Sequence, residues 1–240
     1  MTMRKSTKAL LFSAAIATTV CSGIASAELT ANASALSNYI FRGPTYSGDS
    51  AVVQGGIDWS NDSGAYVGTW VSTLGSAGLG GNEIDFYSGY AGKAGKFTYD
   101  IGVLTYQYTS SPEFNYTEAY FSTTYNIFTI GANYTIDAAS GNKNAAFDQG
   151  DVYLFASADF NAGPVDVSIY AGSYNYSNDG DYGNGDISYA HVGASLSKDG
   201  FSFAIDKSDV DESNAAVGGL AANMNAVRFT ISYSLDFELK

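Results

Sequence analysis

The stretch Phe128-Thr-Ile-Gly-Ala-Asn-Tyr-Thr-Ile-Asp137 alternates apolar with small or polar residues along its whole length. Successive side chains of a β-strand point to opposite faces, so this period of two predicts a strand with one apolar and one polar face. Residues 227–237 repeat the pattern, with apolar residues at odd positions and polar residues at even positions. No stretch of comparable length has the 3.6-residue period of a helix, so the sequence predicts an all-β chain.

The same alternation predicts twelve strands along the chain. They cover residues 29–41, 51–60, 65–73, 83–92, 97–109, 115–125, 128–137, 151–160, 165–176, 187–197, 201–208 and 226–237. Connections after even-numbered strands are short and contain turn residues, as in Asn61-Asp62-Ser63-Gly64, whereas connections after odd-numbered strands are longer, as in residues 138–150. This asymmetry is typical of outer-membrane β-barrels, which have short periplasmic turns and long extracellular loops.

Aromatic residues of the apolar face gather at the short-turn end of the predicted strands. They are Trp59, Tyr90, Phe97, Tyr125, Phe128, Phe160, Phe201 and Phe237. Aromatic girdles form where barrel strands cross a membrane interface, whereas a soluble β-sandwich has no reason to collect aromatics at one end. We therefore predict a single transmembrane antiparallel up-and-down β-barrel of about 12 strands over residues 28–240. A secreted soluble β-barrel with an internal ligand site is the alternative fold.

The N-terminus is typical of a Sec signal peptide covering residues 1–27. Arg4, Lys5 and Lys8 precede an apolar segment, and Ala25-Ser26-Ala27 supplies the small-residue cleavage pattern. We expect cleavage after Ala27 and localisation of the mature chain in the bacterial outer membrane.

Cleavage after Ala27 would leave a strongly acidic chain without cysteine. It removes three positive charges and no negative one, which changes the formal net charge from −13 to −16, and it removes Cys21. The mature chain therefore has no disulfide or thiol chemistry. Nucleic acid is excluded as a partner because phosphate binding needs a basic face.

The polar face of the predicted strands should line the lumen. The candidate pore-lining residues are Arg42, Asp58, Trp70, Glu83, Asp85, Asp100, Glu118, Asp166, His191 and Arg228. Carboxylates outnumber basic groups in this set, and Asp159 and Asp206 share the face, so a water-filled lumen would favour cations. The alternative is a structural network in which the charges pair. In that case Arg42 and Arg228, on the first and last strands, would meet at the barrel seam and cluster with carboxylates such as Asp58.

Many tyrosines share the predicted inward face with Trp70. They are Tyr66, Tyr87, Tyr106, Tyr108, Tyr116, Tyr120, Tyr153, Tyr170, Tyr174, Tyr176 and Tyr189. Aromatic faces with hydroxyls would suit sugar rings, but small barrels also fill their interior with bulky side chains. Bulk filling is the favoured interpretation, and it predicts a narrow lumen.

The sequence predicts no catalytic, metal or cofactor site. His191 is the only histidine, and no Gly-x-Ser-x-Gly motif surrounds a candidate serine. Glu83 and Asp85 share a face, and residues 178–186 form an acidic, glycine-rich loop with oxygen ligands of the kind that calcium binds. We interpret that loop as a solvated connection, and we predict that the protein is not an enzyme.

Five motifs resemble the TorF-type porin family of proteobacterial outer-membrane proteins. They are Ser37-Asn38-Tyr39-Ile40-Phe41-Arg42-Gly43, similar to the family's opening "DYxFRG" pattern, and residues 53–58, 64–70, 83–90 and 115–118. They occur in the family's order and cover essentially the mature chain. Asn38 stands where the family more often has Asp. The resemblance implies a small outer-membrane barrel identified as a porin, with no firmly assigned substrate.

Together these features predict a narrow, weakly cation-preferring outer-membrane channel for small hydrophilic solutes. The expected partners are outer-membrane lipid, the solutes, and the barrel-assembly machinery, which would recognise the alternating C-terminal strand through Tyr233, Leu235 and Phe237. The alternative function is a non-conducting barrel that acts through its extracellular loops in adhesion or surface contact.

Overall fold

The computed structural model describes residues 2–4, 28–75, 80–139, 147–178, 187–211 and 223–239, and almost all of them lie in antiparallel strands or their connections. The strands are β1 (Thr2–Arg4), β2 (Glu28–Leu36), β3 (Val52–Ser60), β4 (Ala65–Thr73), β5 (Asn82–Ala94), β6 (Phe97–Tyr108), β7 (Tyr116–Tyr125), β8 (Phe128–Ala138), β9 (Val152–Ala162), β10 (Val165–Asn175), β11 (Tyr189–Lys198), β12 (Phe201–Ser208) and β13 (Arg228–Leu239). One short 3-10 helix, η1 (Pro112–Phe114), precedes β7.

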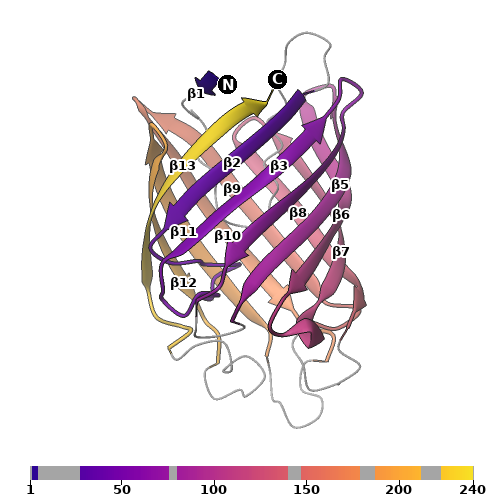
Figure 1. Cartoon of the computed structure of the whole chain (residues 1–240), viewed down its shortest axis with the longest axis vertical. Helices are drawn as coiled ribbons and strands as arrows, with labels where there is room; N and C mark the ends of the chain where they lie inside the picture. Colours follow the sequence, from indigo (N-terminus) through magenta and orange to yellow (C-terminus); the bar gives the residue numbers. More distant parts are fainter. Residues whose placement is uncertain are drawn as a thin grey trace.

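Strands β2 to β13 form a closed barrel, as Figure 1 shows. Each strand pairs with the next along the chain, and β13 pairs with β2 from Ser232 opposite Leu36 to Leu239 opposite Leu29. The predicted twelve-stranded antiparallel all-β barrel is therefore confirmed. β1 adds a short pairing with Asp236, Phe237 and Glu238 of β13. The rest of the predicted signal peptide, residue 1 and residues 5–27, lies outside the described residues.

Short turns and long connections lie at opposite ends of the barrel. Both chain ends lie at the short-turn end, which is uppermost in Figure 1. There Asp199 and Gly200 join β11 to β12 with φ values of 53° and 87°. A type I′ hairpin turn needs positive φ at both central residues, and Asp-Gly is one of the sequences that supplies it.

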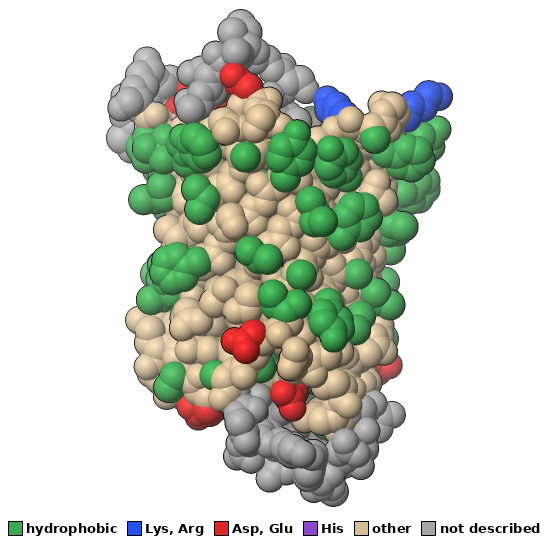
Figure 2. Space-filling view, turned by 90° about the vertical axis from the view of Figure 1, so that its right-hand side faces the viewer, with side chains coloured by type: hydrophobic (Ala, Val, Ile, Leu, Met, Phe, Trp, Pro, Cys, Tyr) green, Lys and Arg blue, Asp and Glu red, His purple; other side chains and the backbone are tan. Residues whose placement is uncertain are grey.

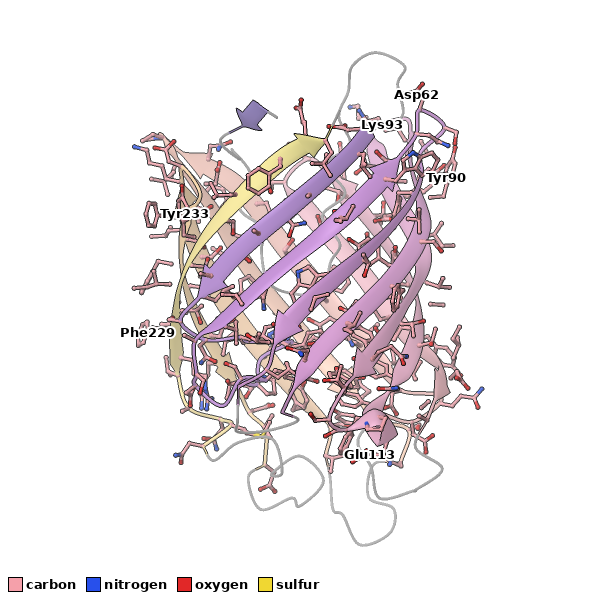
Figure 3. The ribbon with its side chains drawn as sticks, viewed as in Figure 1. Asp62, Tyr90, Lys93, Glu113, Phe229 and Tyr233 are labelled. Carbon is pink, nitrogen blue, oxygen red and sulfur yellow. The ribbon has the colours of Figure 1, made fainter. Side chains whose placement is uncertain are left out.

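The outer face of the barrel is apolar, with aromatic residues near the short-turn end. Of the eight predicted girdle residues, seven are exposed on this face: Trp59, Tyr90, Phe97, Tyr125, Phe128, Phe160 and Phe201. The eighth, Phe237, is half-buried. Figure 2 shows a band of hydrophobic side chains close to that end, and Figure 3 shows Tyr90, Tyr233 and Phe229 pointing outward. Among the described residues, no helix is long and apolar enough to cross a membrane.

One predicted strand boundary is wrong. The alternation predicts a first strand over residues 29–41, but β2 ends at Leu36 and the chain turns into the barrel. Residues 37–41 alternate as a strand would, and Ser37 still donates its backbone N–H to Ile231 of β13, but residues 39–41 pair with residues just after them rather than with the wall.

Aromatic side chains of the inward face lie opposite glycines on neighbouring strands. The pairs that stand in direct register are Gly68 with Tyr87, Gly89 with Tyr66, Gly102 with Tyr120, Gly131 with Phe155, and Gly193 with Tyr170. A Cβ atom at any of these glycines would overlap the paired aromatic side chain. Each aromatic side chain therefore lies over the backbone of the adjacent strand, and the missing Cβ makes the close approach feasible.

Gly193→Ala should destabilise the barrel because its methyl group overlaps the ring of Tyr170. We expect the free energy of unfolding to fall by about 1–3 kcal/mol, as for other overpacked sites. Urea unfolding in lipid vesicles, followed by tryptophan fluorescence, would measure the loss. Ala190→Val, which adds volume to an exposed position of the same strand, is the matched control and should change little. Equal stability of the two variants would contradict the packing argument.

Candidate functional site

Residues 37–50, between β2 and β3, form a hairpin inside the barrel, which we call the inner hairpin. The backbone N–H of Phe41 donates to the carbonyl of Pro44 at 2.9 Å, and that of Tyr46 donates to Tyr39 at 2.8 Å. Arg42 and Gly43 at the tip have φ values of 51° and 109°. Two consecutive positive φ values are the requirement of a type I′ turn, so the Arg-Gly pair reverses the chain within two residues.

Gly43 fits the hairpin tip against the wall at β11 and β12. A Cβ atom on Gly43 would lie 2.7 Å from Cβ of His191 on β11 and 3.1 Å from Cβ of Ser208 on β12. Both its positive φ and this close approach require glycine. The tip of the inner hairpin therefore packs against β11 and β12, which follow β13 around the barrel from β2.

The side chain of Arg42 extends to the opposite wall and pairs with Glu118 on β7. Nη1 and Nη2 donate to Oε1 and Oε2 of Glu118, both at 2.7 Å. Both side chains are at most 1% exposed. Glu118 also accepts hydrogen bonds from the hydroxyl of Tyr106 at 3.0 Å and from Nδ2 of Asn133 at 2.9 Å. A bidentate, desolvated pair of this kind fixes both the position and the orientation of the two groups.

Aromatic rings complete the surroundings of the Arg42 guanidinium. Its Cζ atom lies 4.2 Å from the ring centroid of Tyr153 on β9, 5.3 Å from that of Tyr174 on β10, and 4.8 Å from that of Phe41. A guanidinium within about 6 Å of an aromatic ring face is attracted by the ring quadrupole. We call the wall residues Tyr106, Glu118, Tyr153 and Tyr174 the guanidinium cage.

A second ion pair holds the base of the inner hairpin. Nε of Arg228 on β13 donates to Oδ1 of Asp49 at 2.7 Å, and Nη2 donates to Oδ2 at 3.2 Å. Asn38 also donates to Asp49 and accepts from the hydroxyl of Thr45 at 2.6 Å. The hydrogen bonds from Arg228 and Asn38 hold the pKa of Asp49 below its usual value.

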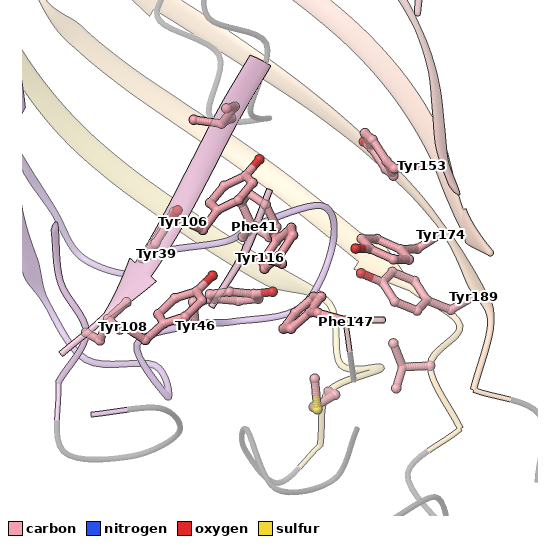
Figure 4. Close-up of a cluster of buried hydrophobic side chains, with 14 of the residues drawn as sticks. Tyr39, Phe41, Tyr46, Tyr106, Tyr108, Tyr116, Phe147, Tyr153, Tyr174 and Tyr189 are labelled. Carbon is pink, nitrogen blue, oxygen red and sulfur yellow. The ribbon is translucent and has the colours of Figure 1, made fainter. Parts of the chain in front are cut away.

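An apolar core surrounds the inner hairpin at the long-loop end of the lumen. Tyr39 and Phe41 pack against Tyr46, and the ring of Phe147, from the β8–β9 connection, stacks on Tyr116 with centroids 4.6 Å apart. Figure 4 shows these rings meeting tyrosines of β6 and β9 to β11 in the barrel interior. The lumen is therefore constricted at this end by the inner hairpin and by aromatic side chains.

Carboxylates at the short-turn half of the lumen accept hydrogen bonds from hydroxyl groups. Tyr66 donates to Asp100 at 2.5 Å, and Ser168 donates to Asp159 at 2.6 Å. Tyr87 donates to Asp58. These carboxylates are half-exposed or exposed, unlike the buried Glu118. The barrel interior thus has an aromatic constriction at one end and an acidic, more accessible part at the other.

The other predicted inward residues also lie on the interior side of the wall. Glu83 and Asp85 are buried on β5, where Tyr108 donates to Glu83 at 3.3 Å. The ring of Trp70 contacts Tyr39, and Asn161 donates to the half-buried Asp166. Asp206 accepts from Tyr170 at 2.6 Å.

His191 lies on the interior face of β11 and makes a hydrogen bond with a tyrosine. It is buried, and its Nε2 lies 2.9 Å from the hydroxyl of Tyr153. Among the described residues, no group of three or more His, Cys, Asp or Glu side chains is arranged to hold a metal ion. Of the predicted acidic loop, residues 179–186 lie outside the described residues.

The predicted cluster at the barrel seam is wrong. Arg42 does not lie on the first strand beside Arg228, because the chain leaves the wall after Leu36. Each arginine instead forms its own ion pair, with Glu118 and with Asp49. The alternation missed the inner hairpin, although Gly43-Pro44 is a turn signal that marks the hairpin tip.

Breaking the Arg42–Glu118 pair from one side should be strongly destabilising. Glu118→Gln leaves a buried guanidinium without its carboxylate, and we expect a loss of about 3–5 kcal/mol in the free energy of unfolding. Arg42→Met combined with Glu118→Gln should cost less than the sum of the two single changes. Urea unfolding of the wild type, Glu118→Gln, Arg42→Met and the double variant gives the coupling energy between the two side chains. Glu113→Gln, at an exposed position, is the control. Additive losses would mean that the two side chains do not interact.

The Asp49–Arg228 pair should contribute little and should depend on pH. Asp49 is 54% exposed, so Asp49→Asn should cost less than about 1 kcal/mol at neutral pH. Because the pKa of Asp49 is lowered in the folded protein, the contribution is complete above the unfolded value of about 3.9 and is lost as the pH falls through the lower folded value. Unfolding curves of both proteins across the acidic range should therefore converge at low pH. A difference that stays constant down to the most acidic condition would argue against this pair.

Several solved structures are similar to this chain. The KdgM porin superimposes with a TM-score of 0.53 at 9% sequence identity, covering 88% of this chain and 99% of that chain. The NanC porin gives a TM-score of 0.48 at 14% identity, covering 88% and 100%. OccAB4 of Acinetobacter baumannii gives 0.42 at 8% identity, covering 88% and 62%. At these identities the likeness to KdgM shows the fold alone.

Comparison with curated proteins finds no match. One family model, described as "Bacterial protein of unknown function (Gcw_chp)", matches residues 21–236, which is nearly the whole chain. The chain therefore belongs to the Gcw_chp family of bacterial proteins.

Proposed function

We propose that this protein is an outer-membrane channel for the passive diffusion of small hydrophilic solutes, with a weak preference for cations. The observation that carries the proposal is the closed barrel with an apolar outer face and a polar, charged interior. In lipid every backbone polar group needs a partner, and closure through β13 and β2 supplies partners for both edges of the sheet. The fold shared with KdgM and the resemblance to the TorF-type porins support the same function.

The proposal includes the cellular route of the protein. Cleavage after Ala27 would release the mature chain, and the alternating residues Tyr233, Leu235 and Phe237 would present β13 to the barrel-assembly machinery. Of the three, Tyr233 is exposed on the outer face, beside Phe201. Outer-membrane lipid would then contact the apolar band (Figure 2).

The cation preference follows from which interior charged groups form ion pairs and which do not. Arg42 and Arg228 are each bound to a carboxylate, so neither presents an uncompensated positive charge to the lumen. Asp58, Asp159 and Asp206 accept hydrogen bonds from neutral hydroxyl groups, which leave their negative charge uncompensated. Carboxylates along a water-filled path attract cations and repel anions.

One observation favours the second candidate, a non-conducting barrel that acts through its loops. The inner hairpin crosses the lumen and is held at its tip by a buried ion pair. If it never moves, the constriction would prevent solute flow, and the loops at the long-loop end would be the functional surface. Conductance distinguishes the two candidates.

The purified protein in planar bilayers should give conductance steps, with a reversal potential in a KCl gradient that indicates cation preference. The triple variant Asp58→Asn, Asp100→Asn and Asp166→Asn should lower the cation-to-anion permeability ratio by roughly twofold or more, because it removes negative charge from the lumen. The triple variant Asp62→Asn, Glu113→Gln and Asp137→Asn changes exposed residues and is the matched control. Figure 3 shows Asp62 and Glu113 at opposite ends of the barrel.

Absence of steps in every protein would refute channel function and favour the non-conducting barrel. Steps with anion preference, or equal ratios in both triple variants, would refute the role of the interior carboxylates. Cell fractionation together with a gel-mobility shift on boiling checks the localisation, since folded outer-membrane barrels resist detergent until heated. Recovery of the protein in the soluble periplasmic fraction would contradict it.

A further inference from the structure

We propose that the guanidinium cage is a solute-binding site that Arg42 occupies as an internal ligand, and that a solute bearing a guanidinium group displaces Arg42 and loosens the inner hairpin. This inference rests on the proposed channel function and names the class of solute that the channel would take. It predicts that binding of the solute and opening of the constriction are one event.

The cage is a complete site without the inner hairpin. Its carboxylate, hydroxyl and two aromatic rings come from β6, β7, β9 and β10, whereas only Phe41 belongs to the hairpin. Tyr106 and Asn133, also on the wall, donate to Oε2 of Glu118 and hold the carboxylate in place. The site would therefore keep its shape when Arg42 leaves, since strands of the barrel position every wall group.

The geometry selects a guanidinium over an ammonium group. Two parallel hydrogen bonds of 2.7 Å join the two terminal nitrogens to the two carboxylate oxygens, and Tyr106 lies 3.2 Å from Nη2. The planar group also faces the ring of Tyr153 at 4.2 Å. An ammonium group offers a single charged centre and cannot match this fork or stack on a ring.

Arg42 itself is an imperfect occupant of the cage. Its φ of 51° lies in the left-handed region, which is strained for a residue with a Cβ atom. Its buried Nε has no hydrogen-bond partner among the described residues. A solute has no backbone strain and can orient all its nitrogens freely. Strained backbone conformations cluster at ligand-binding sites and in segments that switch between two conformations.

The solute concentration needed to displace Arg42 depends on how firmly the inner hairpin holds it. A tethered group competes with an effective concentration in the millimolar range when its linker is short and flexible. The packed inner hairpin holds Arg42 more firmly than such a linker, so a solute of similar intrinsic affinity would act at roughly millimolar concentration or above. Since a ligand shifts a conformational equilibrium only through its differential affinity for the two states, the solute must bind the cage only when Arg42 is out.

The test uses ethylguanidinium chloride, with ethylammonium chloride as a probe of equal charge. Arg42→Ala empties the cage but keeps Glu118, whereas Arg42→Ala combined with Glu118→Gln removes the carboxylate as well. In Arg42→Ala, ethylguanidinium should raise the temperature of the gel-mobility shift at concentrations about tenfold or more below those of ethylammonium. The double variant should show no difference between the two probes. If Arg42→Ala folds only with a cage ligand, the refolding yield in each probe becomes the readout.

Bilayer conductance tests the second half of the inference. In the wild type, millimolar ethylguanidinium should raise the single-channel conductance by about twofold or more over the same concentration of ethylammonium. Arg42→Ala combined with Glu118→Gln should conduct equally in both probes. Equal effects of the two probes on the stability of Arg42→Ala would overturn the site. Selective stabilisation without selective conductance in the wild type would overturn displacement.

Failure of this inference and failure of the proposed function give different results. Conductance steps with no preference for ethylguanidinium in either readout leave the channel in place and refute the guanidinium site. Selective stabilisation of Arg42→Ala with no current in any variant supports the site, refutes the channel and overturns the opening of the constriction.

Discussion

The pairing of β13 with β2 is the constraint on which the rest of the structure depends. Once these two strands hydrogen-bond along their length, the sheet has no open edge and every residue on a strand belongs to either an outer or an inner face. The outer face can then be apolar throughout, and the inner face receives the charged residues and most of the tyrosines. The glycines opposite the tyrosines follow from the same closure, because rings on a concave surface need room against the neighbouring strand.

Closure also leaves interior space and buried charges, which the inner hairpin fills and pairs at one end of the barrel. A barrel of twelve strands encloses more space than inward side chains of average size would fill, and buried charges in that space need partners. Residues 37–50 fold inward and bring Arg42 to Glu118, so a carboxylate that would be isolated on β7 becomes part of a bidentate pair. The same segment adds Tyr39, Phe41 and Tyr46 to the aromatic core at the long-loop end.

The two ends of the interior therefore have different chemistry. The long-loop end is aromatic and buried, with the guanidinium of Arg42 bound there, whereas the short-turn half presents more accessible carboxylates and hydroxyl groups. A cation that entered from the short-turn end would meet carboxylates first and then the cage. The channel proposal and the guanidinium-binding proposal therefore share one physical basis. Carboxylates line the interior, and they are more deeply buried toward the constriction.

The sequence by itself determined the number of strands, their faces, the short turns and the aromatic girdle, because each depends on a local period of two and on nearby turn residues. The inward positions of Asp58, Glu83, Glu118 and His191 follow from the same alternation. The alternation placed Arg42 at the end of the first strand, since residues 37–41 alternate like the wall. Only the tertiary structure decided that this segment enters the lumen and that Arg42 meets Glu118, 76 residues away. Alternation assigns a side chain to a face, but contact across a lumen depends on barrel closure and on the path of the chain between strands.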